Sequence, residues 1–134
     1  MSEILKITKI SLILYTLGGL IFGVLYLFLT DIYLYALTDW PFVDPYYPRA
    51  FGGTLLVLGI FACLGYFKKE WEHLKLTYEL AQTWLIVVLI LNILELVFLS
   101  PTLSILALTN TIINTIIVIC FLVIGIYCYL KQKG

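Results

Sequence analysis

Four long apolar runs constrain this chain more than any other feature of its sequence. They cover residues 10–29, 50–67, 77–99 and 105–130, and the first of them contains no charged residue. A helix needs about 20 apolar residues to cross a hydrocarbon core of roughly 30 Å. Lipid cannot hydrogen-bond to the backbone, so such runs must be helical inside a membrane. The sequence therefore predicts an all-α protein, an integral membrane four-helix bundle.

Composition excludes the main classes of soluble protein. Of the 134 residues, 63% are apolar and 12% are charged, whereas soluble domains are about a quarter charged. Eight basic residues balance eight acidic ones, so the charge does not favour a nucleic-acid partner. Three cysteines are too few and too scattered for a disulfide framework. We expect a single membrane domain, 1–134, with helices at about 10–29, 50–67, 72–99 and 103–130 and an outer aromatic loop at 30–49.

Lysine and arginine are distributed unevenly between the two sides that these spans define. One side carries seven lysines, and the other carries only Arg49. An excess of basic residues marks the cytoplasmic side of a multi-pass protein. We therefore expect both termini in the cytoplasm, the 30–49 loop outside, and a location in the cell membrane. The seven lysines are Lys6, Lys9, Lys68, Lys69, Lys75, Lys131 and Lys133.

Glycines recur at helical spacing in the first two spans. Gly19 and Gly23 lie four residues apart in the first span, and Gly52 and Gly59 lie on one face of the second. In a membrane, small residues on one face let two helix backbones approach closely. We expect the two glycine stripes to meet as a close-packed helix pair. The alternative is that Gly19 and Gly23 form the seam of a homodimer.

Polar residues in the last two spans are the most informative candidates for a site. Glu95 lies deep in the third span with Asn92 on nearly the same face, and Asn110 and Asn114 lie four residues apart in the fourth. If the chain turns near Pro101, antiparallel helices place Asn92 level with Asn110. A carboxylate at the bilayer centre costs about 2.5–3.5 kcal/mol on insertion scales. Two interpretations remain open: the four residues form a hydrogen-bonded network that holds the helices together, or Glu95 binds a proton or a substrate.

The 30–49 loop is the second candidate site. It is rich in aromatic residues, and its three prolines exclude a long helix. We expect it to lie at the level of the outer lipid headgroups. Its candidate residues are Asp31, Trp40, Asp44 and Arg49, of which the acids are possible ion-pair partners of Arg49. The loop is either a structural cap over the bundle or a lid over a lipid or small apolar ligand, with Glu95 beneath it.

A short pattern flanks the second span. Residues 48–52 read Pro-Arg-Ala-Phe-Gly, and residues 68–71 read Lys-Lys-Glu-Trp after the intervening apolar helix. This P-R-x-x-G…(K/R)-x-x-W pattern resembles that of uncharacterised small four-helix membrane proteins of prokaryotes. The resemblance implies the four-helix fold and carries no activity. The small multidrug resistance transporters have a similar length, but their essential glutamate lies in the first helix, whereas the deep acid here is Glu95 in the third.

The motifs of several common chemistries are missing from the sequence. It contains no C-x-x-C, G-x-S-x-G or H-E-x-x-H motif, and one histidine cannot ligate a haem from both sides. We expect no cofactor, no metal and no enzymatic activity. The leading hypothesis is a protein that binds a lipid or an apolar small molecule, or an accessory subunit of a larger membrane complex.

Two further hypotheses stay open. One is a small oligomeric, proton-coupled transporter that uses Glu95, and the weaker one is an intramembrane lipid-modifying enzyme with Glu95 and Asp31 as acid and base. The expected partners are the lipid bilayer, a bound lipid, and a homo-oligomer or larger membrane complex, with no nucleic acid.

Overall fold

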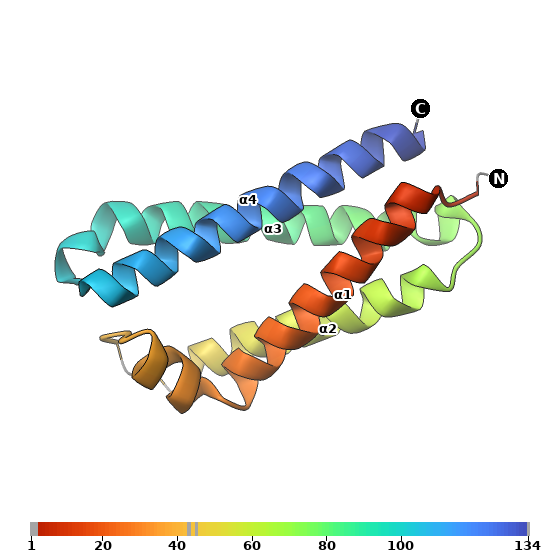
Figure 1. Ribbon diagram of the computed structural model, residues 1–134. Helices are drawn as coiled ribbons and strands as arrows, with labels where there is room; N and C mark the ends of the chain where they lie inside the picture. The colour runs from red at the N-terminus through yellow and green to blue at the C-terminus, as the bar shows by residue number, and fades with distance from the viewer. Residues whose placement is uncertain (1–2, 43, 45, 134) are drawn as a thin grey trace.

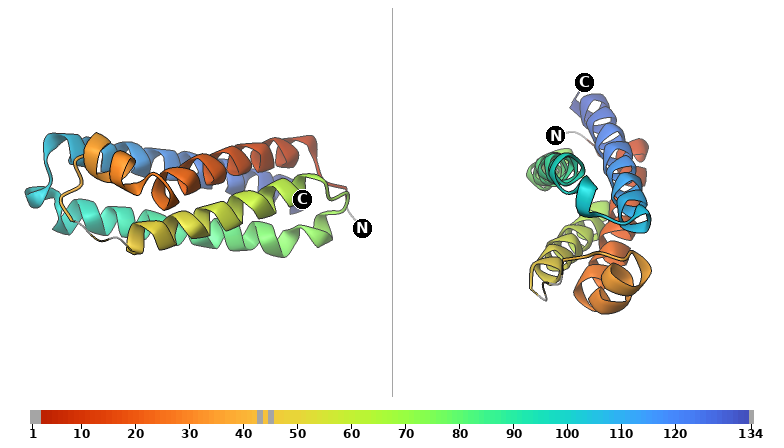
Figure 2. Two further views of the ribbon diagram at one scale, coloured as in Figure 1. Left: turned by 90° about the horizontal axis from the view of Figure 1, so that it is seen from below. Right: turned by 90° about the vertical axis from the view of Figure 1, so that its left-hand side faces the viewer.

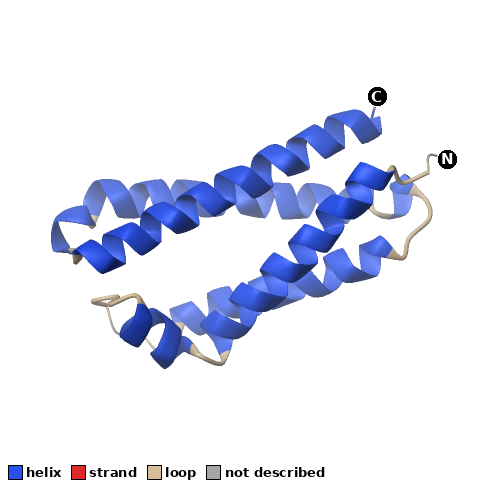
Figure 3. Cartoon of the chain, in the orientation of Figure 1, coloured by secondary structure: helices blue, strands red, loops and turns tan. Residues whose placement is uncertain are grey.

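The computed structural model describes residues 3–42, 44 and 46–133, and four long helices make up most of them (Figure 1; Figure 3). A short π-helix and two 3-10 turns lie between the long helices. Among the described residues there is no strand, so the predicted all-α fold is confirmed. The elements in chain order are α1 (Lys6–Leu27), η1 (Asp31–Leu37), α2 (Tyr47–Tyr66), η2 (Trp71–His73), α3 (Lys75–Phe98), η3 (Ser100–Thr102) and α4 (Ile105–Lys133).

Each of the four long helices is long and apolar enough to cross a membrane. They contain 22, 20, 24 and 29 residues, and a helix rises about 1.5 Å per residue. Large apolar side chains cover their outer faces, including Ile21, which is 56% exposed, and Ile105, which is 86% exposed. A protein in water rarely exposes so much apolar surface, whereas a bilayer solvates it. These helices indicate a multi-pass membrane protein.

The helices extend beyond the apolar runs at several ends. α1 begins at Lys6, α2 begins at Tyr47, and α4 continues to Lys133. Hydropathy marks only the apolar part of a helix, whereas backbone hydrogen bonds continue into the polar flanks. The third helix, expected from residue 72, instead begins at Lys75, because Trp71–His73 forms a separate 3-10 turn.

The four helices form two antiparallel hairpins. α1 packs along α2, and α3 packs along α4 (Figure 1; Figure 2). Contacts between the hairpins, α1 with α4 and α2 with α3, are fewer. The hairpins approach each other at the end that holds both chain termini, which we call the terminal end. They diverge toward the opposite end, which holds η1 and which we call the η1 end (Figure 1).

Glycines bring α1 and α2 into backbone contact. A Cβ atom placed on Gly19 would lie 2.7 Å from Cα of Gly59, and one placed on Gly52 would lie 2.6 Å from the backbone nitrogen of Leu27. Only a residue without a Cβ permits such an approach. The two glycine stripes therefore face each other in the structure. Gly19 and Gly23 are buried against α2 within one chain, so the face that a homodimer seam would need is already occupied.

Hydrogen bonds that join the hairpins concentrate at the terminal end. The Tyr15 hydroxyl of α1 donates to the carbonyl of Phe121 in α4 (2.7 Å) and accepts from Nε2 of Gln82 in α3 (2.8 Å). One helical turn away, the hydroxyls of Ser11 and Tyr78 lie 3.0 Å apart. We call Ser11, Tyr15, Tyr78 and Gln82 the terminal polar joint. It fixes α1 to both helices of the other hairpin.

Gly125 of α4 lies directly against the terminal polar joint. Its carbonyl accepts a hydrogen bond from the Tyr78 hydroxyl at 3.3 Å. A Cβ atom at this position would overlap the Tyr15 hydroxyl and the Gln82 amide. The absence of a side chain at residue 125 is therefore what lets the polar groups of α1 and α3 reach the α4 backbone.

The packed apolar core lies at the terminal end as well. Beside it, the buried polar residues Thr8 and Gln132 are joined by a hydrogen bond of 3.1 Å, which connects α1 to the end of α4. No comparable cluster of buried side chains is found toward the η1 end of the described chain. The clustered buried residues are Ile4, Leu12, Tyr15, Ala62, Trp71, Leu74, Tyr78, Leu85 and Cys128.

Candidate ligand-binding cavity

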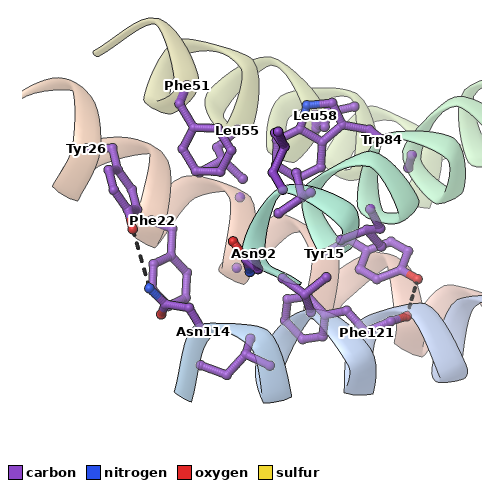
Figure 4. A pocket seen from close by; sticks show the side chains of 18 of the residues that line it. Tyr15, Phe22, Tyr26, Phe51, Leu55, Leu58, Trp84, Asn92, Asn114 and Phe121 are labelled. Atoms are coloured by element: carbon purple, nitrogen blue, oxygen red, sulfur yellow. Dashed lines mark hydrogen bonds between the residues drawn. The ribbon is translucent and has the colours of Figure 1, made fainter. Parts of the chain in front are cut away.

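A cavity of about 410 Å³ lies between the two hairpins (Figure 4). All four long helices line it, and so does the segment between α1 and α2. The hairpins are fixed at the terminal end and diverge from there, which leaves interhelical space that the side chains do not fill. Most of the lining is apolar, and it includes Phe22, Leu55, Leu58, Val88, Ile117 and Phe121.

Polar side chains gather where α3 ends and α4 begins. The structure brings all four predicted polar candidates, Asn92, Glu95, Asn110 and Asn114, to the wall of this one cavity. Asn92 lies near its middle in Figure 4. Asn114 donates from Nδ2 to the hydroxyl of Tyr26 in α1, at 3.5 Å (Figure 4). The cavity is therefore amphipathic, with a polar region toward the η1 end.

The four candidates do not form the hydrogen-bonded network that was one of the two interpretations. Among the described residues, no hydrogen bond joins any two of the four; Asn114 instead bonds to Tyr26 of α1, and the hydroxyl of Tyr33 interacts with both Asn114 and Asn110. No described residue donates a hydrogen bond to the half-buried carboxylate of Glu95 or forms an ion pair with it. The amides and the carboxylate are thus at the cavity wall instead of being used to hold α3 against α4.

A row of aromatic rings connects η1, α1, α2 and α3. Tyr33 of η1 contacts Tyr26 edge to face with ring centroids 5.3 Å apart, and Tyr26 contacts Phe51 of α2 at 5.2 Å. Phe51 stacks on Trp84 of α3 at 5.5 Å and 22°. Such pairs stabilise a structure by about 0.5–1.5 kcal/mol each beyond area burial. The row links the hairpins, because Phe51 belongs to α2 and Trp84 to α3.

Tyr33 lies outside the membrane-spanning helices, and its side chain is half-buried beside the polar region. Burial raises the pKa of its phenol, and hydrogen bonding with Asn114, Tyr26 and Asn110 opposes that rise. The hydroxyl therefore remains a neutral hydrogen-bonding group at the edge of the polar region.

The 30–49 segment, whose last residues form the start of α2, contributes two of its four predicted residues to the cavity. Trp40 and Asp44 line it, as does Phe42, whose ring contacts Trp40 edge to face. Asp44 also stabilises the start of α2, because its Oδ1 accepts hydrogen bonds from the backbone amides of residues 46 and 47 at 2.8 and 3.2 Å. Residues 31–37 form a single short π-helix, in keeping with the expectation that the prolines exclude a long one.

The other two predicted residues of this segment lie away from the cavity. Arg49 and Asp31 form an ion pair at 3.9 Å, and the Asp31 side chain is 81% exposed. Neither residue lines the cavity. Asp31 therefore does not share the lining of the cavity with Glu95.

Sequence reasoning missed several residues that define the cavity. It did not assign Phe51 or Trp84 to a binding surface, although both line the cavity. It also overlooked Gln82, although a glutamine within an apolar span is itself a signal of interhelical hydrogen bonding. Aromatic and aliphatic residues give no such signal, because the same residues face lipid elsewhere on this bundle.

Within residues 3–42, 44 and 46–133, no three His, Cys, Asp or Glu side chains lie close enough together to hold a metal ion. The three cysteines are free thiols, and Cys128 is the buried one. Comparison of the chain with models of protein families, with curated proteins and with solved structures finds no match.

Proposed function

We propose that this protein binds an amphiphile, a lipid or a small apolar molecule with one polar end, in the cavity between its hairpins. The observation that carries the proposal is the amphipathic lining of that cavity. Apolar side chains from four helices surround most of it, and polar groups, among them Asn92, Glu95 and Asn114, lie together toward the η1 end. The apolar part of the ligand lies toward the terminal end and its polar part lies among these groups.

The dimensions and chemistry of the cavity support this proposal. Ligand sites are typically concave, mainly apolar and about 300–1,000 Å³ in volume, with few polar groups to orient the ligand. The cavity, at about 410 Å³, lies within this range. Each square ångström of apolar ligand surface transferred from water contributes about 25 cal/mol. An acyl or alkyl chain is the common biological group that fills a long apolar space between helices.

We also propose the orientation of this site in the cell membrane. Seven of the eight basic residues lie at the terminal end, and Arg49 alone lies at the η1 end. This excess of basic residues favours an orientation in which the terminal end lies in the cytoplasm and the η1 end lies on the outer side of the membrane. The polar region of the cavity then lies toward the outer leaflet, with the aromatic segment 30–46 beside the lipid headgroups.

Tryptophan fluorescence tests ligand binding with a control inside the same chain. Trp84 lines the cavity, whereas Trp71 is 5% exposed in the core at the terminal end. Two variants each retain one of these residues, with the other tryptophans replaced by phenylalanine. We expect an amphiphile with a brominated alkyl chain to quench Trp84 saturably, and an unbrominated analogue to reverse the quenching. Trp71, which does not line the cavity, should be quenched less than Trp84.

A pair of phenylalanine substitutions on α3 completes this test. Ala81→Phe places a ring in the cavity that Ala81 lines, whereas Val87→Phe places one on an outer face where Val87 is 50% exposed. We expect the first substitution to abolish saturable quenching of Trp84 and the second to leave it unchanged. Quenching that never saturates, or that survives Ala81→Phe, would show that the probe only dissolves in the surrounding lipid and would refute the proposal.

One observation favours a second candidate function, a proton-coupled transporter. Glu95 lies within a membrane-spanning helix and lines the cavity, and no described residue donates a hydrogen bond to its carboxylate. Such residues often mark proton or substrate pathways. In a transporter, Glu95→Gln should give a folded protein that binds its ligand but shows no proton-driven flux in vesicles. A protein that only binds should show no flux in either form.

A further inference from the structure

We infer that the polar end of the ligand is a protonated amine, so that the cavity is selective for long-chain ammonium amphiphiles over anionic or neutral ones. This inference rests on the proposed function, because it names the chemical class of ligand for the same cavity. It is carried by the charges, the hydrogen-bonding groups and the aromatic rings that line the polar region.

The charged groups that line the cavity have one sign. They are Glu95 and Asp44, and none of the described lining residues is lysine, arginine or histidine. Arg49, the nearest basic residue along the chain, is ion-paired with Asp31 away from the lining. A phosphate, sulfate or carboxylate headgroup would meet negative charge here without a cation to balance it, and like charges in a low dielectric repel strongly. The lining therefore disfavours anionic lipids.

The two acids are not equally available to a ligand. Asp44 already accepts two backbone hydrogen bonds at the start of α2, at 2.8 and 3.2 Å. Glu95 accepts none from the described residues. An ammonium group supplies both the hydrogen-bond donors and the positive charge that a carboxylate in an apolar environment needs. We therefore assign Glu95 as the principal partner of the amine.

The neighbours of Glu95 suit an ammonium group as well. Asn92 and Asn110 line the same region, and their side-chain carbonyl oxygens are acceptors for N–H donors. Tyr26, which accepts the hydrogen bond from Asn114, belongs to the aromatic row that continues along the cavity wall to Phe51 and Trp84. The face of an aromatic ring attracts a cation by about 0.5–2 kcal/mol, and most strongly where water is excluded. Carboxylate, amides and aromatic rings together form a site for a cation attached to an apolar chain.

Three probes of equal chain length separate these possibilities. Dodecylamine is protonated at pH 7, dodecanol is its neutral analogue, and dodecanoate is its anionic one. Each is titrated against the full-length protein in a neutral maltoside detergent, and bound mass is counted by native mass spectrometry. We expect dodecylammonium to bind at least tenfold more tightly than dodecanol, and dodecanoate to bind more weakly than both.

Two charge-removing substitutions on the same helix test the assignment to Glu95. Glu95→Gln removes the acid at the cavity, and Glu79→Gln removes one near the terminal end, where Glu79 accepts a hydrogen bond from Tyr129 at 2.6 Å and lies outside the lining. We expect Glu95→Gln to reduce the preference for dodecylammonium to within threefold of dodecanol while dodecanol binds as before. Glu79→Gln should retain the full preference.

The outcomes distinguish this inference from the proposed function on which it rests. If all three probes bind equally, or if dodecanoate binds most tightly, the amine selectivity is refuted and the amphiphile site stands. If Glu79→Gln lowers the preference as much as Glu95→Gln, the effect is one of overall charge and the inference fails. If no probe binds, the proposed function fails too. The ranking of the probes on the unmodified protein decides the matter even if Glu95→Gln does not fold.

Discussion

Gly19→Ala is the sharpest test of how the first hairpin is held together. The added Cβ would lie 2.7 Å from Cα of Gly59 and 2.8 Å from the carbonyl oxygen of Leu55, both of them backbone atoms. An ordinary contact of this kind is 3.4–4 Å, so the two helices must move apart by several tenths of an ångström. Neither backbone can rotate out of the way as a flexible side chain could.

The expected cost follows from that separation. Widening a packed contact by 0.5–1 Å forfeits about a quarter to a half of its dispersion energy, and overpacking in a well-packed interior costs about 1–3 kcal/mol. Against this, replacing glycine by alanine inside a helix gains up to about 1 kcal/mol. We expect Gly19→Ala to lower the free energy of unfolding, by up to about 3 kcal/mol and by about 1 kcal/mol for a mid-range cost with the full propensity gain.

Gly53→Ala provides the matched control on the partner helix. A Cβ at Gly53 would meet no atom within 4 Å, so only the gain in helix propensity applies and stability should be unchanged or slightly higher. The free energy of unfolding is measured for both variants by titrating dodecyl sulfate into maltoside micelles and following helix content by circular dichroism. Equal stabilities for Gly19→Ala and Gly53→Ala would refute the argument that backbone contact between α1 and α2 determines stability.

Two other predictions concern the terminal polar joint and the orientation. Gly125→Ala should destabilise the protein more than Gly19→Ala in the same titration, because the added methyl group overlaps the Tyr15 hydroxyl and the Gln82 amide and disrupts polar contacts between three helices. A neutral surface substitution changes stability by less than about 0.5 kcal/mol. A change that small for Gly125→Ala would contradict this prediction. For orientation, Ala36→Cys and Lys133→Cys are made separately in a chain whose native cysteines are replaced by alanine. An impermeant thiol reagent added to intact cells should label residue 36 and not residue 133, and the reverse pattern would invert the proposed topology.

The helices were predictable from sequence because lipid leaves the backbone only one way to satisfy its hydrogen bonds in spans of this kind. The close approach of α1 and α2 was predictable for a similar reason, since the spacing of Gly19 and Gly23 has few uses other than backbone contact. Helix ends such as Lys6 and Tyr47 could not be predicted in this way. Hydropathy marks only the part of a helix that contacts lipid, whereas the helix itself continues beyond the lipid.

The candidate site was predictable only in part. Depth along the bundle follows from residue number, so Asn92, Glu95, Asn110 and Asn114 could be placed at related levels. Whether they point at one another or into an open space depends on helix rotation and on the angle between the hairpins, which residue numbers do not encode. The cavity itself arises where two packed surfaces diverge, and no single residue marks such a place.

The division into two hairpins also determines the order in which the molecule can be assembled. Packing of α1 on α2, and of α3 on α4, joins helices that are neighbours in the chain, so the first hairpin can close while the second is still being synthesised. The terminal polar joint can be completed only after α4 has entered the membrane, because the carbonyls of Phe121 and Gly125 accept two of its hydrogen bonds. The space between the hairpins is thus the last part of the structure to be enclosed. If the protein binds an amphiphile as proposed, a molecule already dissolved in the bilayer would be captured as the two hairpins dock, without crossing any helix.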